Sequence, residues 1–306
     1  MVAQSPSSGM GHTAAAPADA VLAERPSLLA RALKLARRKP LGTFALLIIV
    51  FVWLVAAFAP AIAHYYWRDS LNGPRLTAPN GHFWFGTDFV GRDVFSRVVW
   101  GARLSLTISF AATALGIGFG SLVGILSGYF LGTVDLIVQR ILDAFQALPV
   151  LVLLMVIVAV FGAQLYVVML ALMVITIPAS SRIVRSTVIA VREHAYIEAA
   201  KAVGAGHPRI ILRYIIPNSF APVIVLAALQ LGSNLLVQAA LSFLGLTSSE
   251  YPDWGGMLNA GARQYMVTAP WLVFAPGLAI ALTVFAYNIM GDTLRDLLDP
   301  RLRGGR

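Results

Sequence analysis

Long apolar runs alternate with short polar segments along most of this chain. The first run, residues 41–63, holds 23 residues without an ionisable side chain. As a helix it would measure roughly 35 Å, enough to cross a hydrocarbon core of about 30 Å. Five more runs predict spans near residues 104–130, 141–161, 165–181, 220–246 and 270–291. Because the runs are continuous rather than alternating, we predict an all-α membrane protein with six transmembrane helices, not a barrel.

The composition supports a membrane protein. Hydrophobic residues make up 58% of the chain and charged residues 12%, whereas a soluble domain has about 25% charged residues. The mean hydropathy is +0.77. The chain contains no cysteine, which excludes disulfides and thiol chemistry.

Basic residues predict the orientation. Six spans place both termini on one side, and 17 of the 23 Lys and Arg lie in the segments on that side. The positive-inside rule therefore predicts that both termini and the polar connector 182–218 are cytosolic. Anionic lipid beside these residues accounts for the net charge of +9, so we expect membrane lipid as a partner and no nucleic acid.

The spans divide the chain into five parts. Residues 1–40 predict a disordered cytosolic tail followed by a basic helix on the membrane surface. The first transmembrane helix, 41–63, leads into an extracytoplasmic loop, 64–103. Residues 104–291 form the main transmembrane domain, which includes the connector, and residues 292–306 form a second cytosolic tail.

Motifs for nucleotide or metal chemistry are missing from the sequence. It has no G-x-x-x-x-G-K-[ST] loop for phosphates, and no H-E-x-x-H or Cys/His cluster for a metal. We therefore expect no catalytic residue, no metal site and no enzyme activity. The middles of the spans also lack the carboxylates typical of ion-driven carriers. An ion-coupled secondary carrier is thus the alternative, and the main hypothesis is that energy enters from a partner protein.

The connector between the fourth and fifth spans has the pattern of two short helices. Residues 193–203 favour a helix, residues 204–208 stop it, and residues 209–216 start a second helix that Pro217 ends. Any exposed helix that ends at a glycine gives a similar pattern. The position between two spans, with an acidic Glu198 and small residues that allow close approach, nevertheless favours docking onto a cytosolic motor.

Four stretches of the sequence carry a family resemblance. Residues 198–217 resemble the EAA motif of permease subunits of bacterial ABC importers. The run F-G-T-D-F-V-G-R-D-V-F-S-R from Phe85 is similar to a signature of the C-type permeases of dipeptide, oligopeptide, glutathione and nickel importers. Residues 241–246 with 253–258 resemble a later signature of that family, and residues 291–301 resemble its usual end. The resemblance covers about residues 41–303.

The resemblance implies a permease subunit in the bacterial inner membrane that forms half of the pathway of an ATP-driven importer of short peptides. It implies as partners a homologous B-type permease, two cytosolic ABC ATPases and an extracytoplasmic substrate-binding protein. ATP would be hydrolysed by partner subunits, so no cofactor is expected in this chain. Nickel chelates and glutathione are the alternative cargoes. The residues implied in coupling to the ATPase are Glu198, Ala199, Ala200, Gly204 and Pro217.

Two stripes of residues repeat every four positions along predicted spans. Glycines at 116, 120, 124 and 128 form a smooth face, for packing within the subunit or for the seam with the B-type subunit. The second stripe is polar and consists of Gln230, Asn234, Gln238 and Ser242. It has two equal interpretations, interhelical hydrogen bonding or a water-filled translocation pathway in which neutral groups meet a peptide backbone.

Charged residues in the extracytoplasmic loop have two interpretations as well. They can form a solvated, self-paired turn, or they can join residues before the last span in a docking surface for the binding protein. The residues of this predicted surface are Asp88, Arg92, Asp93, Asp253 and Trp254.

Overall fold

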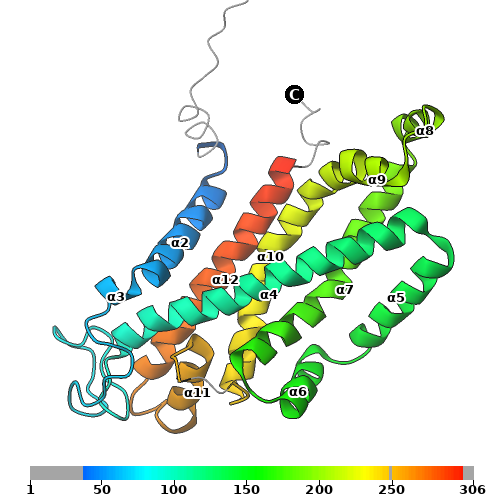
Figure 1. Cartoon of the computed structure of the whole chain (residues 1–306). Helices are drawn as coiled ribbons and strands as arrows, with labels where there is room; N and C mark the ends of the chain where they lie inside the picture. Colours follow the sequence, from blue (N-terminus) through cyan, green and yellow to red (C-terminus); the bar gives the residue numbers. More distant parts are fainter. Residues whose placement is uncertain (1–36, 248–249, 299–306) are drawn as a thin grey trace, which may run out of the picture. The chain divides into compact units, whose positions relative to one another are not determined.

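The computed structural model describes residues 37–247 and 250–298, and the regular structure of these residues is helical (Figure 1). An isolated bridge joins Thr87 and Asp93 in the loop before α4. The helices are α2 (Pro40–Ala57), α3 (Ala59–Ile62), α4 (Val94–Phe130), α5 (Gly132–Gln146), α6 (Val150–Phe161), α7 (Leu165–Arg192), α8 (Ala195–Ala202), α9 (His207–Ile210), the π-helix η2 (Ile211–Ile215), α10 (Ile216–Phe243), α11 (Trp254–Gln264) and α12 (Trp271–Leu298).

Among the described residues, five helices are long and apolar enough to cross a membrane: α2, α4, α7, the continuous stretch His207–Phe243, and α12. A sixth span is possible only if α5 and α6 are taken together. The predicted third span, 141–161, is wrong as a single helix, because α5 and α6 meet at an angle of 88°. Pro149 lies in the break, where its ring disfavours a helical conformation for Leu148 and its nitrogen cannot donate a hydrogen bond.

Several predicted ends also move. The helix predicted from residue 104 begins at Val94, where the Asp93 side chain accepts a hydrogen bond from the Ser96 amide and caps it. α7 continues to Arg192, eleven residues past the predicted end at Ser181, and α12 continues to Leu298. The first span is interrupted after Ala57. The predicted tail and basic helix of residues 1–40 fall almost entirely outside the described residues, as do residues 299–306.

The glycine stripe of α4 packs against α7. All four glycines are buried. A Cβ atom added at Gly124 would lie 2.5 Å from the Ser181 carbonyl oxygen, and one added at Gly128 would lie 2.9 Å from the Arg185 carbonyl oxygen. No real Cβ tolerates such distances from backbone, so only glycine permits this approach. The stripe therefore serves packing within the subunit, and the alternative of a seam with another subunit is wrong for this face.

α5 contacts α7 through charged groups instead. The Arg185 guanidinium donates through Nε to Asp135 Oδ1 at 2.6 Å and through a terminal nitrogen to Asp135 Oδ2 at 2.5 Å. Ser127 at the end of α4 also donates to Asp135. A second pair joins Arg182 to Asp143 at 2.5 Å. The outward side of α5 carries exposed apolar residues, including Leu136 and Ile137.

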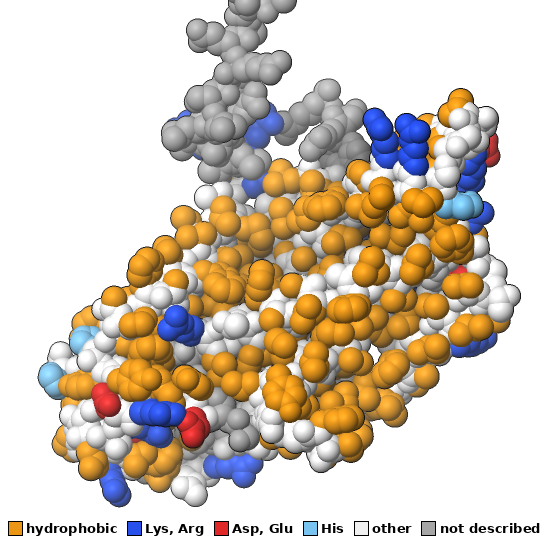
Figure 2. Space-filling model, in the orientation of Figure 1, with side chains coloured by type: hydrophobic (Ala, Val, Ile, Leu, Met, Phe, Trp, Pro, Cys, Tyr) orange, Lys and Arg blue, Asp and Glu red, His pale blue; other side chains and the backbone are white. Residues whose placement is uncertain are grey.

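Charged and apolar side chains separate along the molecule. Figure 2 shows hydrophobic side chains over the middle of the long helices, while many of the Lys, Arg, Asp and Glu side chains in this view lie around α8 and around the loop before α4. Among the described residues the two ends of the helices are thus the polar regions, and both contain residues singled out by the sequence.

Candidate functional site

The connector forms a compact two-helix element after α7. α8 ends at Ala202, and the chain turns through Gly204 with φ of +84°, a left-handed conformation that strains any residue with a Cβ. The Gly204 amide donates to the Lys201 carbonyl at 2.9 Å, and the Ala205 amide donates to the Ala200 carbonyl at 3.0 Å. These two bonds are those of a Schellman motif, which closes the end of α8.

One side of this element is buried against the ends of α4 and α7. Ile197 of α8, Ile210 of α9 and Ile215 of η2 are almost completely buried. Their partners in this hydrophobic cluster are Ile125, Tyr129, Val184, Val188 and Val191. Tyr129 and His207 add a hydrogen bond of 2.8 Å between the phenol oxygen and Nδ1. The element is therefore fixed to two long helices and is not a free loop.

The second short helix does not end at Pro217, contrary to the prediction. α9, η2 and α10 form one continuous helical stretch, and Pro217 lies in the first turn of α10. The Ile216 amide donates to the Ile211 carbonyl, five residues back. The π-helix thus interrupts the usual i to i−4 pattern just where the proline lacks its N–H, so the proline costs little there.

The opposite side of the element is exposed and mixed in character. Glu198 and Ala199 are exposed, as are Gly204 and Pro217, whereas Ala200 is buried. Sequence reasoning missed Val203 and Leu212, whose exposed fractions are 84% and 66%. Exposed apolar side chains beside charged ones are typical of protein contacts. A signal was present, because both residues are apolar in a segment otherwise assigned to the cytosol.

Three members of the polar stripe on α10 are buried and bonded inside the chain. The Asn234 amide nitrogen donates to Thr113 Oγ1 at 2.9 Å and to Thr176 Oγ1 at 3.1 Å, which links α10 to α4 and α7. Gln238 Nε2 donates to Ser242 Oγ at 3.2 Å. Gln230 is partly exposed. These contacts fit the interpretation as interhelical hydrogen bonding, and a role in the translocation pathway stays a prediction.

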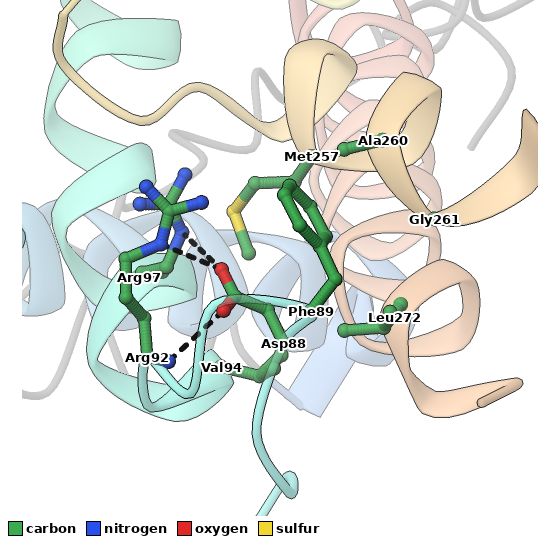
Figure 3. A pocket seen from close by; sticks show the side chains of 9 residues that line it. All are labelled: Asp88, Phe89, Arg92, Val94, Arg97, Met257, Ala260, Gly261 and Leu272. Carbon is green, nitrogen blue, oxygen red and sulfur yellow. Dashed lines mark hydrogen bonds and ion pairs between the residues drawn. The ribbon is translucent and has the colours of Figure 1, made fainter. Parts of the chain in front are cut away.

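The Asp88 carboxylate organises the loop before α4. It accepts hydrogen bonds from the amides of Val90 and Arg92, both at 2.9 Å, and from Arg92 Nε at 2.7 Å. Arg97 approaches the same carboxylate at 3.9 Å, and Figure 3 shows the two arginine side chains converging on it. The turn is self-paired as one interpretation holds, but it is buried rather than solvated, because Asp88 is only 4% exposed.

Asp253 and Trp254 are buried at the same end of the helices. The Asp253 side chain caps α11 by accepting from the Gly256 amide at 3.0 Å, and it also accepts from Gln238 Nε2 at 3.3 Å. Burial raises the pKa of the Asp253 carboxyl, a shift that these hydrogen bonds oppose. The Trp254 indole donates to the Val98 carbonyl at 2.9 Å. The structure thus joins Gln238 and Ser242 of the stripe to Asp253, which the sequence treated as separate sites.

The predicted docking residues have mainly structural contacts. Asp88, Asp93, Asp253 and Trp254 are all buried, and Arg92 is partly exposed. Their side chains therefore hold the loop in shape. A docking surface at this end would consist largely of their exposed neighbours.

The chain is similar to known transport proteins. Residues 116–304 match the family described as binding-protein-dependent transport system inner membrane component. The dipeptide transport system permease protein DppC of Alkalihalophilus pseudofirmus is 41% identical over 89% of this chain and 90% of that protein. The glutathione transport system permease protein GsiD of Escherichia coli O6:K15:H31 is 39% identical over 88% of this chain and 89% of that protein. In fold, the chain resembles a chain of the inward-facing MetNI methionine ABC transporter, with a TM-score of 0.57, 18% identity, and coverage of 67% and 97%.

Proposed function

Because the chain belongs to the family of binding-protein-dependent transport system inner membrane components, we propose that it is the permease subunit of an ATP-driven importer of short peptides. It is a multi-pass inner-membrane protein of the ABC permease class. The observation that carries the proposal is the two-helix element of α8 and α9, which is anchored on one side and exposes apolar and charged residues on the other.

Membership of the family implies an ATPase and a substrate-binding protein as partners. We propose in addition that two cytosolic ABC ATPases and a homologous B-type permease complete the transporter. ATP is then hydrolysed by the partner subunits, and this chain needs no cofactor or catalytic residue of its own. Both termini and the α8–α9 element lie in the cytosol in this proposal, and the loop before α4 lies on the opposite side.

The proposed coupling mechanism is a rigid-body displacement. When the ATPases close, their groove moves with the exposed side of α8, which includes Glu198 and Ala199. Ile197 and Ile210 transmit this movement to α4 and α7 through the buried cluster. Since η2 joins α9 to α10 without a loop, α10 must move with them. The Schellman turn at Gly204 keeps the two short helices at a fixed angle.

The outer end and the pathway complete the proposal. Asp88, Arg92, Asp93, Asp253 and Trp254 support a docking surface for the binding protein by holding the loops that form it. In the polar stripe, Gln230 has exposed surface that can face a pathway shared with the second permease. Asn234, Gln238 and Ser242 would join that pathway only in another state of the transport cycle.

Substitution of Gly204 tests the coupling role. Gly204→Val forces a β-branched residue into the left-handed region at φ of +84°, a strain of at least about 1–2 kcal/mol that the turn can relieve by changing the angle between α8 and α9. We expect peptide uptake to fall to background while the subunit is still inserted at normal abundance. The measurement is uptake of a radiolabelled dipeptide in cells, with immunoblotting of membranes.

Gly206→Val is the matched control. Gly206 lies in the same turn with an ordinary φ of −70°, and an added Cβ there would meet only a Pro208 ring carbon at 3.9 Å. Peptide uptake by Gly206→Val should stay near that of the wild type. Normal uptake by Gly204→Val would contradict the coupling role.

A second experiment distinguishes this function from an ion-coupled carrier that acts alone. We expect an ATPase to co-purify with the wild-type chain, and we expect Glu198→Arg to weaken that association.

A further inference from the structure

A small polar cavity lies where α4 begins and α10 ends, at the end of the long helices opposite the α8–α9 element (Figure 1). Its volume is about 230 Å³. Drug-sized ligands usually occupy about 300–1,000 Å³, so this cavity fits one end of a ligand rather than a whole one. Its polar lining consists of Arg97, Ser242, Thr247, Tyr251, Asp253 and Asn259.

Arg97 is a largely buried cation with weak partners. Its side chain is 16% exposed, yet its Nε atom is 3.9 Å from Asp88 and a terminal nitrogen is 3.5 Å from the Trp67 carbonyl oxygen. Asp88 is already committed to Arg92 and to two backbone amides, as Figure 3 shows for the arginine. A guanidinium carries five N–H donors in a planar fork. Among the described residues, most of the donor capacity of the Arg97 guanidinium is therefore not taken up.

The other walls of the cavity supply neutral groups and one acid. Thr247 Oγ1 donates to Ser242 Oγ at 3.0 Å, and Asn259 contributes an amide. Asp253 holds the Gly256 amide and Gln238 Nε2, while the Gln238 carbonyl oxygen behind it is buried without a hydrogen-bond partner among the described residues. Arg97 is the cation among the lining residues, and Asp253 is the anion. Because Asp253 already accepts two hydrogen bonds from the protein, Arg97 is the charged group that can bind an anionic end of a ligand here.

We propose that this cavity binds the carboxylate end of a short peptide, with the Arg97 guanidinium holding the carboxylate through two parallel N–H donors. Such bidentate pairs are among the strong hydrogen bonds in proteins, and they select a carboxylate by shape as well as by charge. The inference rests on the proposed function, since it gives the imported peptide a first contact inside the permease. The small volume, with Arg97 and Asp253 largely buried in its wall, favours a small molecule over a side chain of the binding protein.

The test compares Arg97→Gln with Arg97→Lys and with the matched control Arg103→Gln. Arg103 is exposed on the same helix and lies over the Trp100 ring, outside the cavity. Uptake of dialanine and of dialanine amide is measured in proteoliposomes that contain the whole transporter. We expect Arg97→Gln to lower dialanine uptake by roughly tenfold or more, the loss typical of one charged hydrogen bond, and to remove the preference for the free carboxylate. Dialanine uptake by Arg97→Lys should lie between that of Arg97→Gln and that of the wild type, and Arg103→Gln should behave as the wild type.

A binding experiment separates this inference from the proposed function. The whole transporter with the wild-type chain, in nanodiscs and without the binding protein, is titrated with millimolar dialanine. Tryptophan fluorescence is followed, because Arg97 donates to the Trp67 backbone carbonyl and Trp254 follows Asp253. One outcome is that dialanine binds, that Arg97→Gln abolishes this binding, and that the wild-type chain imports no peptide. This outcome supports the cavity and refutes the proposed function. Equal loss of acid and amide uptake, or wild-type behaviour of Arg97→Gln, overturns the inference. So does unchanged dialanine binding by Arg97→Gln together with weaker attachment of the binding protein, because the carboxylate would then belong to that protein.

Discussion

α7 contacts two neighbouring helices by opposite means. Against α4 it is held by shape, since the four glycines let backbone approach backbone. Against α5 it is held by charge, through Arg185 with Asp135 and Arg182 with Asp143. The first contact has no room for adjustment, because any added atom collides with carbonyl oxygens. The second consists of ion pairs, whose distances can increase or decrease and whose flexible arginine side chains can exchange partners.

This difference indicates which parts of the subunit move together. Close-packed helices transmit displacement as a unit, so α4 and α7 should follow the α8–α9 element directly. α5 is amphipathic, exposes apolar residues outward, and continues through a sharp bend into α6. A helix held by ion pairs can shift while it stays attached. We therefore expect α5 to be the adjustable part of the subunit, whereas α6 is packed against α7 through the buried Leu154 and Val158.

The largest effect is expected in the close-packed seam. Gly124→Ala places a methyl group where the Ser181 carbonyl oxygen would be 2.5 Å away, and overpacking of this kind costs about 1–3 kcal/mol. The control is Gly118→Ala, since a Cβ at Gly118 meets nothing within 4 Å. Thermal unfolding of the purified subunit in detergent measures both. If Gly124→Ala unfolds at the wild-type temperature, the seam is looser than the structure indicates.

A smaller effect is expected at the inner pair, which is the more buried of the two ion pairs between α5 and α7 and joins Asp135 to Arg185. Asp135→Asn leaves the partly buried Arg185 without its anion, and losing a charged hydrogen-bond partner there should cost about 1–2 kcal/mol. A double-mutant cycle with Arg185→Gln measures the pair itself. We further expect reduced uptake with ATPase activity retained, because α5 would no longer follow α7. Coupled transport at the wild-type ratio of peptide to ATP would argue against this link.

The smallest effect is expected at the outer pair, which is the more exposed ion pair between α5 and α7. Arg182 and Asp143 have side chains that are 45% and 49% exposed, and ion pairs of this kind contribute about 0–1 kcal/mol. Arg182→Gln should therefore change the unfolding temperature by less than Asp135→Asn does. Raising the salt concentration should weaken the outer pair more than the inner one, because exposed charges are screened more strongly. The opposite order would mean that α5 is anchored near its bend.

The sequence was sufficient for the fold class and for the family, since continuous apolar runs and ordered signatures depend on local residues. It was not sufficient where a single residue that ends or begins a helix lies in a segment whose other residues indicate a different interpretation. Pro149 marks the break between α5 and α6, but the apolar residues on both sides of it make the segment resemble one span. Asp93 is an N-cap that the sequence analysis assigned to docking, and recognising the cap would have placed the start of α4 correctly.

The two candidate sites, the α8–α9 element and the polar cavity, differ in how far the sequence could predict them. The residues of the α8–α9 element are contiguous, so their turn at Gly204 is visible in the sequence. The polar cavity joins Arg97 to Asp253 across more than 150 positions. Arg97 enters the sequence analysis only as part of a signature. The residues next to it in the sequence do not indicate that its described partners in space take up few of its N–H donors. Contacts at such separation follow from packing and not from local pattern.

The π-helix η2 also sets the rotational phase of the helix that follows it. Ile210 and Ile215 are five residues apart and both point into the same buried cluster. In an α-helix, five residues turn the chain about 140° past a full revolution, which would put one of the two in solvent. The wider turn absorbs most of that angle. Removing one residue from 211–215 would therefore leave α9 in place and rotate either α10 or Ile215 out of register. The length of this segment, more than its composition, aligns the membrane helix α10 with the α8–α9 element.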